Sequence, residues 1–230
     1  MHFQHADAVW AEHPDLTVGT LHVTGLHAHA DPVLDRFEEI AQTRLAGGTE
    51  ADLPEIQAWR RTFARMGLPP TRYRCASEAL LRRFRKDGAL PRIHPVIDLC
   101  NAVSLAFAIP VGVLDVARIA EFIEVRHADG SEEYLTFGGD TEKPDPGEVI
   151  FADAGNRAHS RRWTNRQSGH SAVRDPTRAA LVVVEAMHAT AATDVPRLID
   201  TLAEALSATW GARTTSARLT RSSSRFTFTG

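Results

Sequence analysis

The chain has 230 residues, of which 43% are hydrophobic and 24% charged, and its formal net charge is -3. This length and apolar fraction suit one good-sized domain with its own core. The balanced charge excludes a histone-like binder and a disordered acidic chain, and every apolar run is shorter than the roughly 20 residues that cross a membrane. The N-terminal segment lacks a basic start followed by an apolar stretch, so we expect a cytosolic protein without a secretory signal.

Basic residues are concentrated in two blocks of the sequence. Residues 60–92 contain 10 basic and 2 acidic residues, and residues 157–178 contain 6 and 1. Of the 26 cations, 24 are arginine, whose guanidinium group binds phosphates and stacks on bases. If the two blocks meet in space, they form a footprint for nucleic-acid phosphates. The alternative is an arginine-rich composition spread over solvated helix faces.

Cysteine and histidine give no evidence of a metal site. Cys75 and Cys100 are too few for a disulfide framework and lack a metal-ligand spacing, so we expect both to be small buried hydrophobic residues. His22, His27 and His29 lie close together in sequence, but no carboxylate or thiol stands at ligand spacing around them. We therefore predict no metal.

Apolar periodicity and end signals predict the elements of the N-terminal half. Asp31-Pro32 has the form of an N-cap followed by proline at the first helical position, and Gly88 has the form of a helix terminator. The pattern predicts a strand over 16–26 and helices over 31–47, 54–67, 77–88 and 94–107.

The segment 94–107 carries three polar residues in an otherwise apolar helix. Asp98, Asn101 and Ser104 are three residues apart, so they lie along one side of the helix. Buried polar groups need partners. This side is therefore either a satisfied network in the core or the wall of a ligand site.

The second half of the chain changes to strands. The turn signal Asp129-Gly130 predicts a hairpin between 119–128 and 132–137, and 148–153 reads as a further strand. The apolar run 179–189 has the character of a central buried strand, and Asp194 is expected to cap a last helix. We predict an α+β fold, a single domain over 1–211 with a mixed or antiparallel sheet flanked by helices, and a flexible tail over 212–230 rich in Ser, Thr and Arg.

Three motifs in this order carry a resemblance to a known family. LLRR at 80–83, VIDLCN at 96–101 and SRRWTNR at 160–166 resemble the B3/B4 domain of the bacterial phenylalanyl-tRNA synthetase beta subunit, and more closely the freestanding proteins built from that domain alone. The resemblance spans roughly residues 10–210. It implies an α+β domain that, in the synthetase, hydrolyses tyrosine wrongly attached to tRNA. The aminoacylating core has no counterpart here, so we expect no ligase activity.

The resemblance also implies site residues. An asparagine that lines the family's editing pocket falls on Asn101. A histidine of the family falls on Gly112, and a glutamate falls at Gly169, beside His170. Two polar groups of the family are therefore missing, which argues against specificity for tyrosine.

Deacylation is attack by water on the ester between an amino acid and the terminal ribose. Positioning of the water and a donor for the oxyanion suffice for such an activated ester. We expect Asn101, Ser104 and His170 to be catalytic, in a pocket bounded by the first two and the 161–171 loop, because they offer an amide, a hydroxyl and a group that exchanges protons near neutral pH. The chain lacks a Gly-x-Ser-x-Gly elbow, which disfavours a Ser-His-Asp nucleophile. The reaction requires no cofactor.

Arginines and their neighbours are the candidates for binding the acceptor end of tRNA. Structural alternatives stay open for several of them. Arg126 either binds the substrate or pairs with Glu132 or Glu133. Trp163 either stacks on the terminal adenine or anchors its loop in the core. Asp115 is expected to cap a helix and not to act as a catalytic acid. The candidate substrate-binding residues are Arg82, Arg83, Arg126, Arg161, Arg162, Trp163, Asn165 and Arg166.

The sequence thus favours a trans-editing hydrolase that acts on mischarged aminoacyl-tRNA, with tRNA as its partner and neither DNA nor a membrane. The rival is a non-catalytic module that binds tRNA or a free amino acid. The amino acid, the tRNA and the oligomeric state are open at this stage.

Overall fold

The computed structural model describes residues 1–229. Its first half contains β1 (His2–His5), α1 (Asp7–Glu12), β2 (Thr17–Thr24), α2 (Asp35–Leu45), α3 (Pro54–Arg65), α4 (Ala76–Asp87) and α5 (Pro95–Phe107). Its second half contains β3 (Val111–Asp115), β4 (Phe122–His127), β5 (Tyr134–Leu135), β6 (Thr141–Glu142), β7 (Val149–Ala152), β8 (Ala158–Arg161), β9 (Arg166–Gln167), β10 (Ala179–Ala186), α6 (Ala191–Trp210), β11 (Arg213–Leu219) and β12 (Arg225–Thr227). Single 3-10 turns lie at Glu50–Asp52 and Val116–Arg118. The α+β class is confirmed.

The strands form two main sheets and one small one. A four-stranded sheet has the order β11-β2-β10-β3, and a six-stranded sheet has the order β12-β1-β4-β7-β8-β9. All named pairs are antiparallel except β1 with β4, which agrees with the predicted mixed or antiparallel character. The strands are divided between packed sheets, however, where the sequence suggested one sheet.

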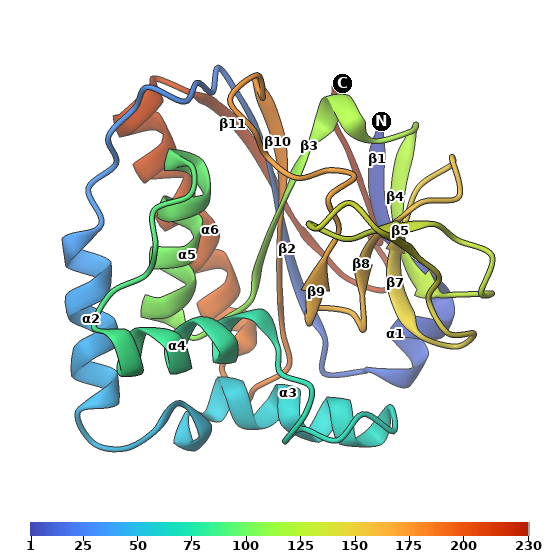
Figure 1. Ribbon diagram of the computed structural model, residues 1–230, viewed down its shortest axis with the longest axis horizontal. Coiled ribbons are helices and arrows are strands. Elements are labelled where there is room, and N and C mark those ends of the chain that lie inside the picture. The colour runs from blue at the N-terminus through green and yellow to red at the C-terminus, as the bar shows by residue number, and fades with distance from the viewer. Residues whose placement is uncertain (230) are drawn as a thin grey trace.

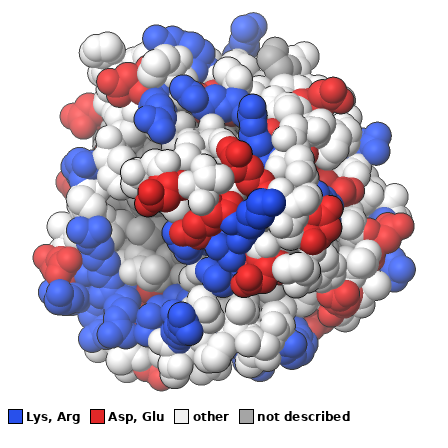
Figure 2. Space-filling model, turned by 45° about the vertical axis from the view of Figure 1, so that its right-hand side comes forward, with Lys and Arg blue, Asp and Glu red and all other residues white. Residues whose placement is uncertain are grey.

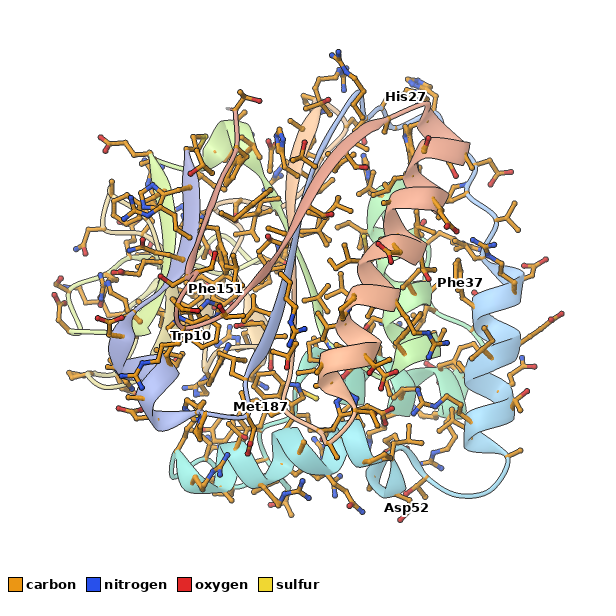
Figure 3. The ribbon with its side chains drawn as sticks, turned by 180° about the vertical axis from the view of Figure 1, so that it is seen from behind. Trp10, His27, Phe37, Asp52, Phe151 and Met187 are labelled. Carbon is orange, nitrogen blue, oxygen red and sulfur yellow. The ribbon has the colours of Figure 1, made fainter. Side chains whose placement is uncertain are left out.

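The four-stranded sheet separates two cores. Figure 1 shows α2, α5 and α6 on one side of it and the six-stranded sheet on the other, with α3 and α4 across the lower end. Along β10, Val182 and Val184 face the helices, whereas Val183 faces the other sheet, because side chains alternate along a strand. Figure 3 places Trp10 and Phe151 on the side of the six-stranded sheet and Phe37 on the helical side. The candidate site lies in the core between the sheets.

The predicted helices that agree best have clear end signals. α3 begins at Pro54 and buries Ile56, Trp59 and Phe63, and α4 ends at Gly88 in the left-handed conformation. The helix predicted from Asp31 begins only at Asp35. Asp194 does not cap α6 but lies inside it, where its carboxylate accepts a hydrogen bond from Thr190.

Two predictions about the second half of the chain are wrong, the hairpin and the flexible C-terminal tail. No hairpin forms across Asp129-Gly130, since β4 pairs with β1 and β7, and β5 pairs with β6. The buried carboxylate of Glu132 accepts hydrogen bonds from the backbone N–H groups of Asp129 and Gly130, and this loop replaces the tight turn. The described part of the tail predicted over 212–230 is also paired, because β11 lies along β2 and β12 along β1; residue 230 lies outside the described residues. Within residues 1–229, no helix has the length and apolar character needed to cross a membrane.

Candidate functional site

A cavity of about 90 Å³ opens between the two main sheets. β3 and β10 contribute one wall, and the β8–β9 turn contributes the other. The apolar part of the lining includes Pro110, Leu114, Phe151 and Val183, and the polar part includes His159, Thr164, Asn165, Arg166, Gln167 and Glu185. Ligand sites typically combine a mainly apolar wall with a few polar groups, so this cavity is the candidate site.

Glu185 is the buried charged group of the cavity. It is 2% exposed on the central strand β10, and its Oε1 lies 2.9 Å from Trp163 Nε1 and 2.6 Å from His5 Nε2. Its Oε2 makes no hydrogen bond within residues 1–229. A buried carboxylate is costly unless it is paired, and the two N–H donors bring it into the core between the sheets. The free oxygen is an acceptor available to a ligand.

Trp163 anchors the β8–β9 turn in the core. Its side chain is 1% exposed, and its ring packs edge-on against Trp59 and His13. Arg162 and Trp163 both have positive φ, 49° and 59°, which costs energy in non-glycine residues. The buried indole and the backbone bond from Trp163 N–H to Val149 O, 2.7 Å, hold this strained turn in place. Trp163 therefore anchors the loop and is not exposed for stacking.

The two basic blocks meet beside the cavity. Asn165 Nδ2 donates to Arg74 O at 2.7 Å, and Ala76 N–H donates to Thr164 O at 2.8 Å. The Arg162 guanidinium lies over the Tyr73 ring, 4.7 Å from its centre, and Arg72 also lies over this ring at 5.3 Å. Since Ala76 and Asn165 both line the cavity, the contact between the blocks forms part of its rim.

The predicted tRNA-binding arginines differ in availability. Arg82, Arg83 and Arg166 are exposed, and Figure 2 shows basic side chains gathered beside a hollow in the lower part of the molecule, where α3 and α4 lie. Arg83 has only the exposed Asp87 as an acidic neighbour, at 3.5 Å, and such surface pairs are weak. Arg166 also pairs with an acidic side chain, Glu142, at 3.2 Å, and this pair is likewise partly exposed. Because exposed pairs are weak, these three guanidinium groups are more accessible to an anion than a buried one.

Arg161 and Arg126 are held in ion pairs. Arg161 is 6% exposed and binds both oxygens of the Glu148 carboxylate, at 3.0 and 2.8 Å. Burial pushes the pKa of Glu148 up, but the hydrogen bonds from Arg161 outweigh burial and hold the pKa below its ordinary value. Arg126 pairs with Glu132, as the structural alternative predicted. The expectation that Arg161 and Arg126 bind substrate conflicts with this geometry, since both guanidinium groups already have carboxylate partners.

Asn101 and Ser104 do not lie in the cavity, so the predicted pocket that joined them to the 161–171 loop is wrong. α5 packs on the helical side of the four-stranded sheet, and the sheet lies between these residues and the cavity. Ser104 Oγ donates to Ile109 O at 2.7 Å and is 1% exposed. Asn101 lines a separate small recess with Asp98, and Asp98 Oδ1 accepts the N–H of Ile93. Asp98 and Ser104 are therefore satisfied by backbone groups, as the first alternative expects, whereas the Asn101 side chain makes no hydrogen bond within residues 1–229.

His170 lies behind the cavity wall. It is half-buried, its Nε2 lies 3.4 Å from Glu133 Oε1, and its ring packs near that of His159. Burial lowers the pKa of His170, and the neighbouring His159 adds to this effect. His170 is not part of the cavity lining, and its role as a proton-exchanging residue stays a prediction.

The structure brings a serine, a histidine and an aspartate together, although the sequence shows no nucleophile elbow. His159 Nδ1 lies 2.8 Å from Ser171 Oγ, and its Nε2 lies 3.1 Å from Asp153 Oδ2. Ser171 is 0% exposed and does not line the cavity, so its hydroxyl is closed to an ester held there. Asp153 also accepts the backbone N–H groups of Ala120, Gly155 and Arg157. The arrangement fixes the loop before β8 and orients the His159 ring at the cavity.

The two glycines at which the resemblance implies polar groups in the family have different surroundings. Gly112 lines the cavity, and a Cβ there meets only Val183 O, at 3.8 Å. Gly169 does not line it, and a Cβ there lies 3.2 Å from the backbone oxygen of Thr136. A Cβ therefore fits at position 112 but is crowded at position 169. The carboxylate present at the cavity is that of Glu185.

Sequence reasoning missed Glu185, Thr164 and His159. The signal for Glu185 was a single charged residue within the valine-rich run of a central strand, which calls for a buried partner or a ligand. Thr164 Oγ1 is buried without a hydrogen-bond partner in the described chain. Asp115 was predicted correctly, because its side chain caps the turn Val116–Arg118 by accepting the N–H of Ala117.

Both cysteines are buried and free, and burial raises the pKa of each thiol to about 12, in agreement with their expected role as small hydrophobic residues. Within the part of the chain that the structure describes, no group of three or more His, Cys, Asp or Glu side chains has the arrangement of a metal site.

Comparisons with known proteins identify the family of the part of the chain that forms this cavity. The model of the B3/4 domain matches residues 58–206, which include every residue of the cavity lining. Phenylalanine–tRNA ligase beta subunits are similar over parts of the chain: 34% identity over 74 residues in Cereibacter sphaeroides (32% of this chain, 9% of the relative), 24% over 115 residues in Haemophilus influenzae (50% and 14%) and 40% over 63 residues in Coxiella burnetii (27% and 8%).

The aligned segments thus span less than a sixth of these relatives. Among solved structures, an N-terminal fragment of the phenylalanyl-tRNA synthetase beta subunit from Pyrococcus horikoshii aligns with a TM-score of 0.42 at 11% identity, over 54% of this chain and 44% of the fragment. The family match covers well over half of the 230 residues. The chain belongs to the B3/4 domain family.

Proposed function

We propose that the protein is a cytosolic deacylase of mischarged aminoacyl-tRNA. One observation carries this proposal: a cavity with a buried carboxylate opens where the two arginine-rich blocks of the chain meet. The cavity suits an aminoacyl group, and the basic rim suits the phosphates next to it. The relatives named above act on phenylalanine and tRNA according to their names, which supports tRNA as the partner.

The polar groups of the cavity match the parts of an aminoacyl ester. The free oxygen of Glu185 accepts a hydrogen bond from the α-ammonium group, and the Thr164 hydroxyl donates to the oxyanion that forms as water attacks. The bond between the carbonyl carbon and the ribose oxygen then breaks, and the proton of the water passes to that oxygen. Because the ester is activated, orientation of ester and water supplies most of the rate enhancement.

The size of the cavity favours a small amino acid. Its volume of about 90 Å³ is below that of an engineered cavity of roughly 150 Å³ that holds benzene. An aliphatic or hydroxyl side chain of a few atoms therefore fits better than the ring of tyrosine. This agrees with the loss of two polar groups at positions 112 and 169.

The tRNA-binding role falls on the available arginines. We assign Arg82, Arg83 and Arg162 to phosphate contacts, together with Arg166, whose partly exposed pair with Glu142 at 3.2 Å is weak. Asn165 fixes the rim through its bond to Arg74 O. Arg126 and Arg161 support the loops behind the rim through Glu132 and Glu148.

The test is release of labelled amino acid from a matrix of matched and mismatched aminoacyl-tRNAs. We expect turnover of mischarged tRNAs that carry small amino acids. Glu185→Gln keeps the shape of the side chain and is expected to lower kcat/KM by about tenfold or more, the loss for one charged contact. Asn101→Ala is the matched control on the other side of the sheet, and we expect it to retain turnover.

The rival function is a non-catalytic module that binds tRNA or an amino acid. It is favoured by the absence of a side chain at Gly112 and by the distance of Asn101 and Ser104 from the cavity. If the wild-type protein releases no amino acid from any aminoacyl-tRNA of the matrix but binds tRNA in a salt-sensitive way, the rival is established and the deacylase is refuted. Loss of turnover in Asn101→Ala with normal turnover in Glu185→Gln refutes the assignment of the cavity.

A further inference from the structure

A second, larger groove lies on the other side of the β8–β9 turn. Its volume is about 520 Å³, within the range of roughly 300–1,000 Å³ typical of ligand sites. The end of α3 contributes Arg65, the turn contributes Arg162, and the segment before β7 contributes Asp145. Arg162 belongs to this groove, whereas the next residues, Trp163 and Thr164, line the first cavity. The turn thus separates two neighbouring sites.

The groove has guanidinium groups that the protein itself does not neutralise. Arg65 makes one side-chain hydrogen bond, to Thr62 Oγ1, and neither Arg65 nor Arg162 has an acidic partner within residues 1–229. Arg162 also lies over Tyr73, which Arg72 flanks as well. Unpaired guanidinium groups bind phosphate well, so this end of the groove fits an anion.

The groove also contains carboxylates, and these differ in availability. Glu148 is neutralised by Arg161 at 2.8 Å. Asp145 is largely exposed, 3.7 Å from Arg161, and Glu12 lies 3.1 Å from His127. A site that binds only inorganic phosphate does not need these carboxylates, which are hydrogen-bond acceptors. A nucleotide does, because it combines a phosphate with an amino group on the base, and carboxylates accept from the amino group of cytosine.

Two aromatic side chains lie between the groove and the first cavity. His13 is 4% exposed and lines the groove, and its ring lies edge-on against Trp163, 4.8 Å between centres. Trp163 in turn donates to Glu185. Occupants of the two sites are therefore separated by the Trp163 side chain and the turn that carries it.

We propose that this groove binds a nucleotide of the single-stranded 3′ end of tRNA, adjacent to the nucleotide that carries the amino acid. Arg65 and Arg162 hold its phosphate, and the carboxylates of Asp145 and Glu12 accept from its base. This inference rests on the proposed function, since it places the chain next to the ester that the first cavity holds. It names a subsite that the resemblance to the family does not supply.

The experiment measures binding of a fluorescent acceptor-stem helix that ends in the unpaired CCA of tRNA, and of the same helix without these nucleotides. Arg65→Ala is compared with Arg61→Ala, which removes the same charge from an exposed position of α3 outside the groove. Arg65 is exposed, and its one side-chain hydrogen bond within residues 1–229 is to Thr62, so the variant is expected to fold. We expect Arg65→Ala to weaken binding of the CCA-ended helix by about tenfold and Arg61→Ala by less than about twofold.

The truncated helix separates the possible results. Equal binding of this helix to wild type and to Arg65→Ala supports the groove as the site of the single-stranded end. If Arg65→Ala and Arg61→Ala have the same effect on the CCA-ended helix while the wild type deacylates tRNA, the groove proposal is refuted and the deacylase stands. If the wild type neither deacylates tRNA nor binds either helix, both proposals are refuted.

Discussion

The ionised carboxylate of Asp153 is expected to stabilise the wall behind the cavity. Burial pushes the pKa of Asp153 up, but the interaction with His159 and the hydrogen bonds from Ala120 and Arg157 outweigh burial and lower it from 3.8 to about 2. The carboxyl is thus more acidic in the folded protein than in the unfolded chain. By linkage, ionised Asp153 stabilises the fold at all pH values above about 4.

The structure gives the size of this effect. A pKa lowered from 3.8 to about 2 corresponds to about 2 kcal/mol, at roughly 1.4 kcal/mol for each pKa unit. This contribution falls as the pH drops below the unfolded pKa and is lost below the folded pKa, and about 1 kcal/mol of it disappears by pH 3. Asp153→Asn removes the ionised group, so we expect it to lower the free energy of unfolding at pH 7 by about 2 kcal/mol or more.

Urea unfolding of the wild type and of Asp153→Asn at several pH values between 7 and 3 measures this difference. We expect the gap between the two proteins to narrow below pH 4, since only the wild type loses the carboxylate. Asp200→Asn removes an exposed carboxylate of α6 that makes no hydrogen bond in the described chain and controls for loss of charge. A gap that stays constant down to pH 3 refutes the reasoning about Asp153.

Three further outcomes follow from the same structure. Arg161→Met leaves the buried Glu148 carboxylate without its cationic partner, so we expect it to lower the free energy of unfolding by about 3–5 kcal/mol. The control Arg82→Ala, on the surface, is expected to change the free energy of unfolding by less than about 0.5 kcal/mol. Equal effects of the two variants in urea unfolding contradict the ion-pair assignment. A Cβ at position 112 meets no close atom, and this position lines the cavity. We therefore expect Gly112→Val to keep a melting temperature near that of the wild type and to reduce deacylation by about tenfold; unchanged turnover contradicts the position of the site. Because burial raises the pKa of both thiols to about 12, we expect iodoacetamide at pH 8 to leave Cys75 and Cys100 unmodified in the native protein and to alkylate them in urea. Mass spectrometry of the two samples measures this, and alkylation of the native protein contradicts it.

Helices with strong local signals were predictable from the sequence. α3 and α5 begin at prolines and carry apolar residues at helical spacing, so their ends and types depend on information within one or two turns. β1 and α1 were missed because their stability comes from partners far away in sequence: β1 pairs with β4 and β12. β11 looked like a polar tail, but as an edge strand it presents mostly exposed side chains and gains its hydrogen bonds from β2.

The candidate site was only partly predictable, because a side chain's sequence position does not say which face of a sheet it reaches. The two arginine blocks were expected to form a phosphate footprint if they met in space. The bond between Asn165 and Arg74 shows that they do meet, and phosphate binding by them stays a prediction. Asn101 and Ser104 were placed in the wrong core, since α5 packs on the helical side of the four-stranded sheet. The hairpin at Asp129-Gly130 was wrong: the Glu132 side chain holds the backbone N–H groups of these two residues, and β4 and β5 pair with β7 and β6 in place of one another.

The missing side chain at position 112 bears directly on how this site differs from its family. Gly112 lies opposite Val183 in the register of β3 and β10, on the side of the sheet that faces the cavity. A histidine at this position, which the resemblance implies for the synthetase domain, projects into the space that is open here. The loss of that histidine therefore creates cavity volume at the same time as it removes a polar group. The buried carboxylate of Glu185 remains, so we infer that the departure changes which aminoacyl group fits and leaves intact an acceptor for its α-ammonium group.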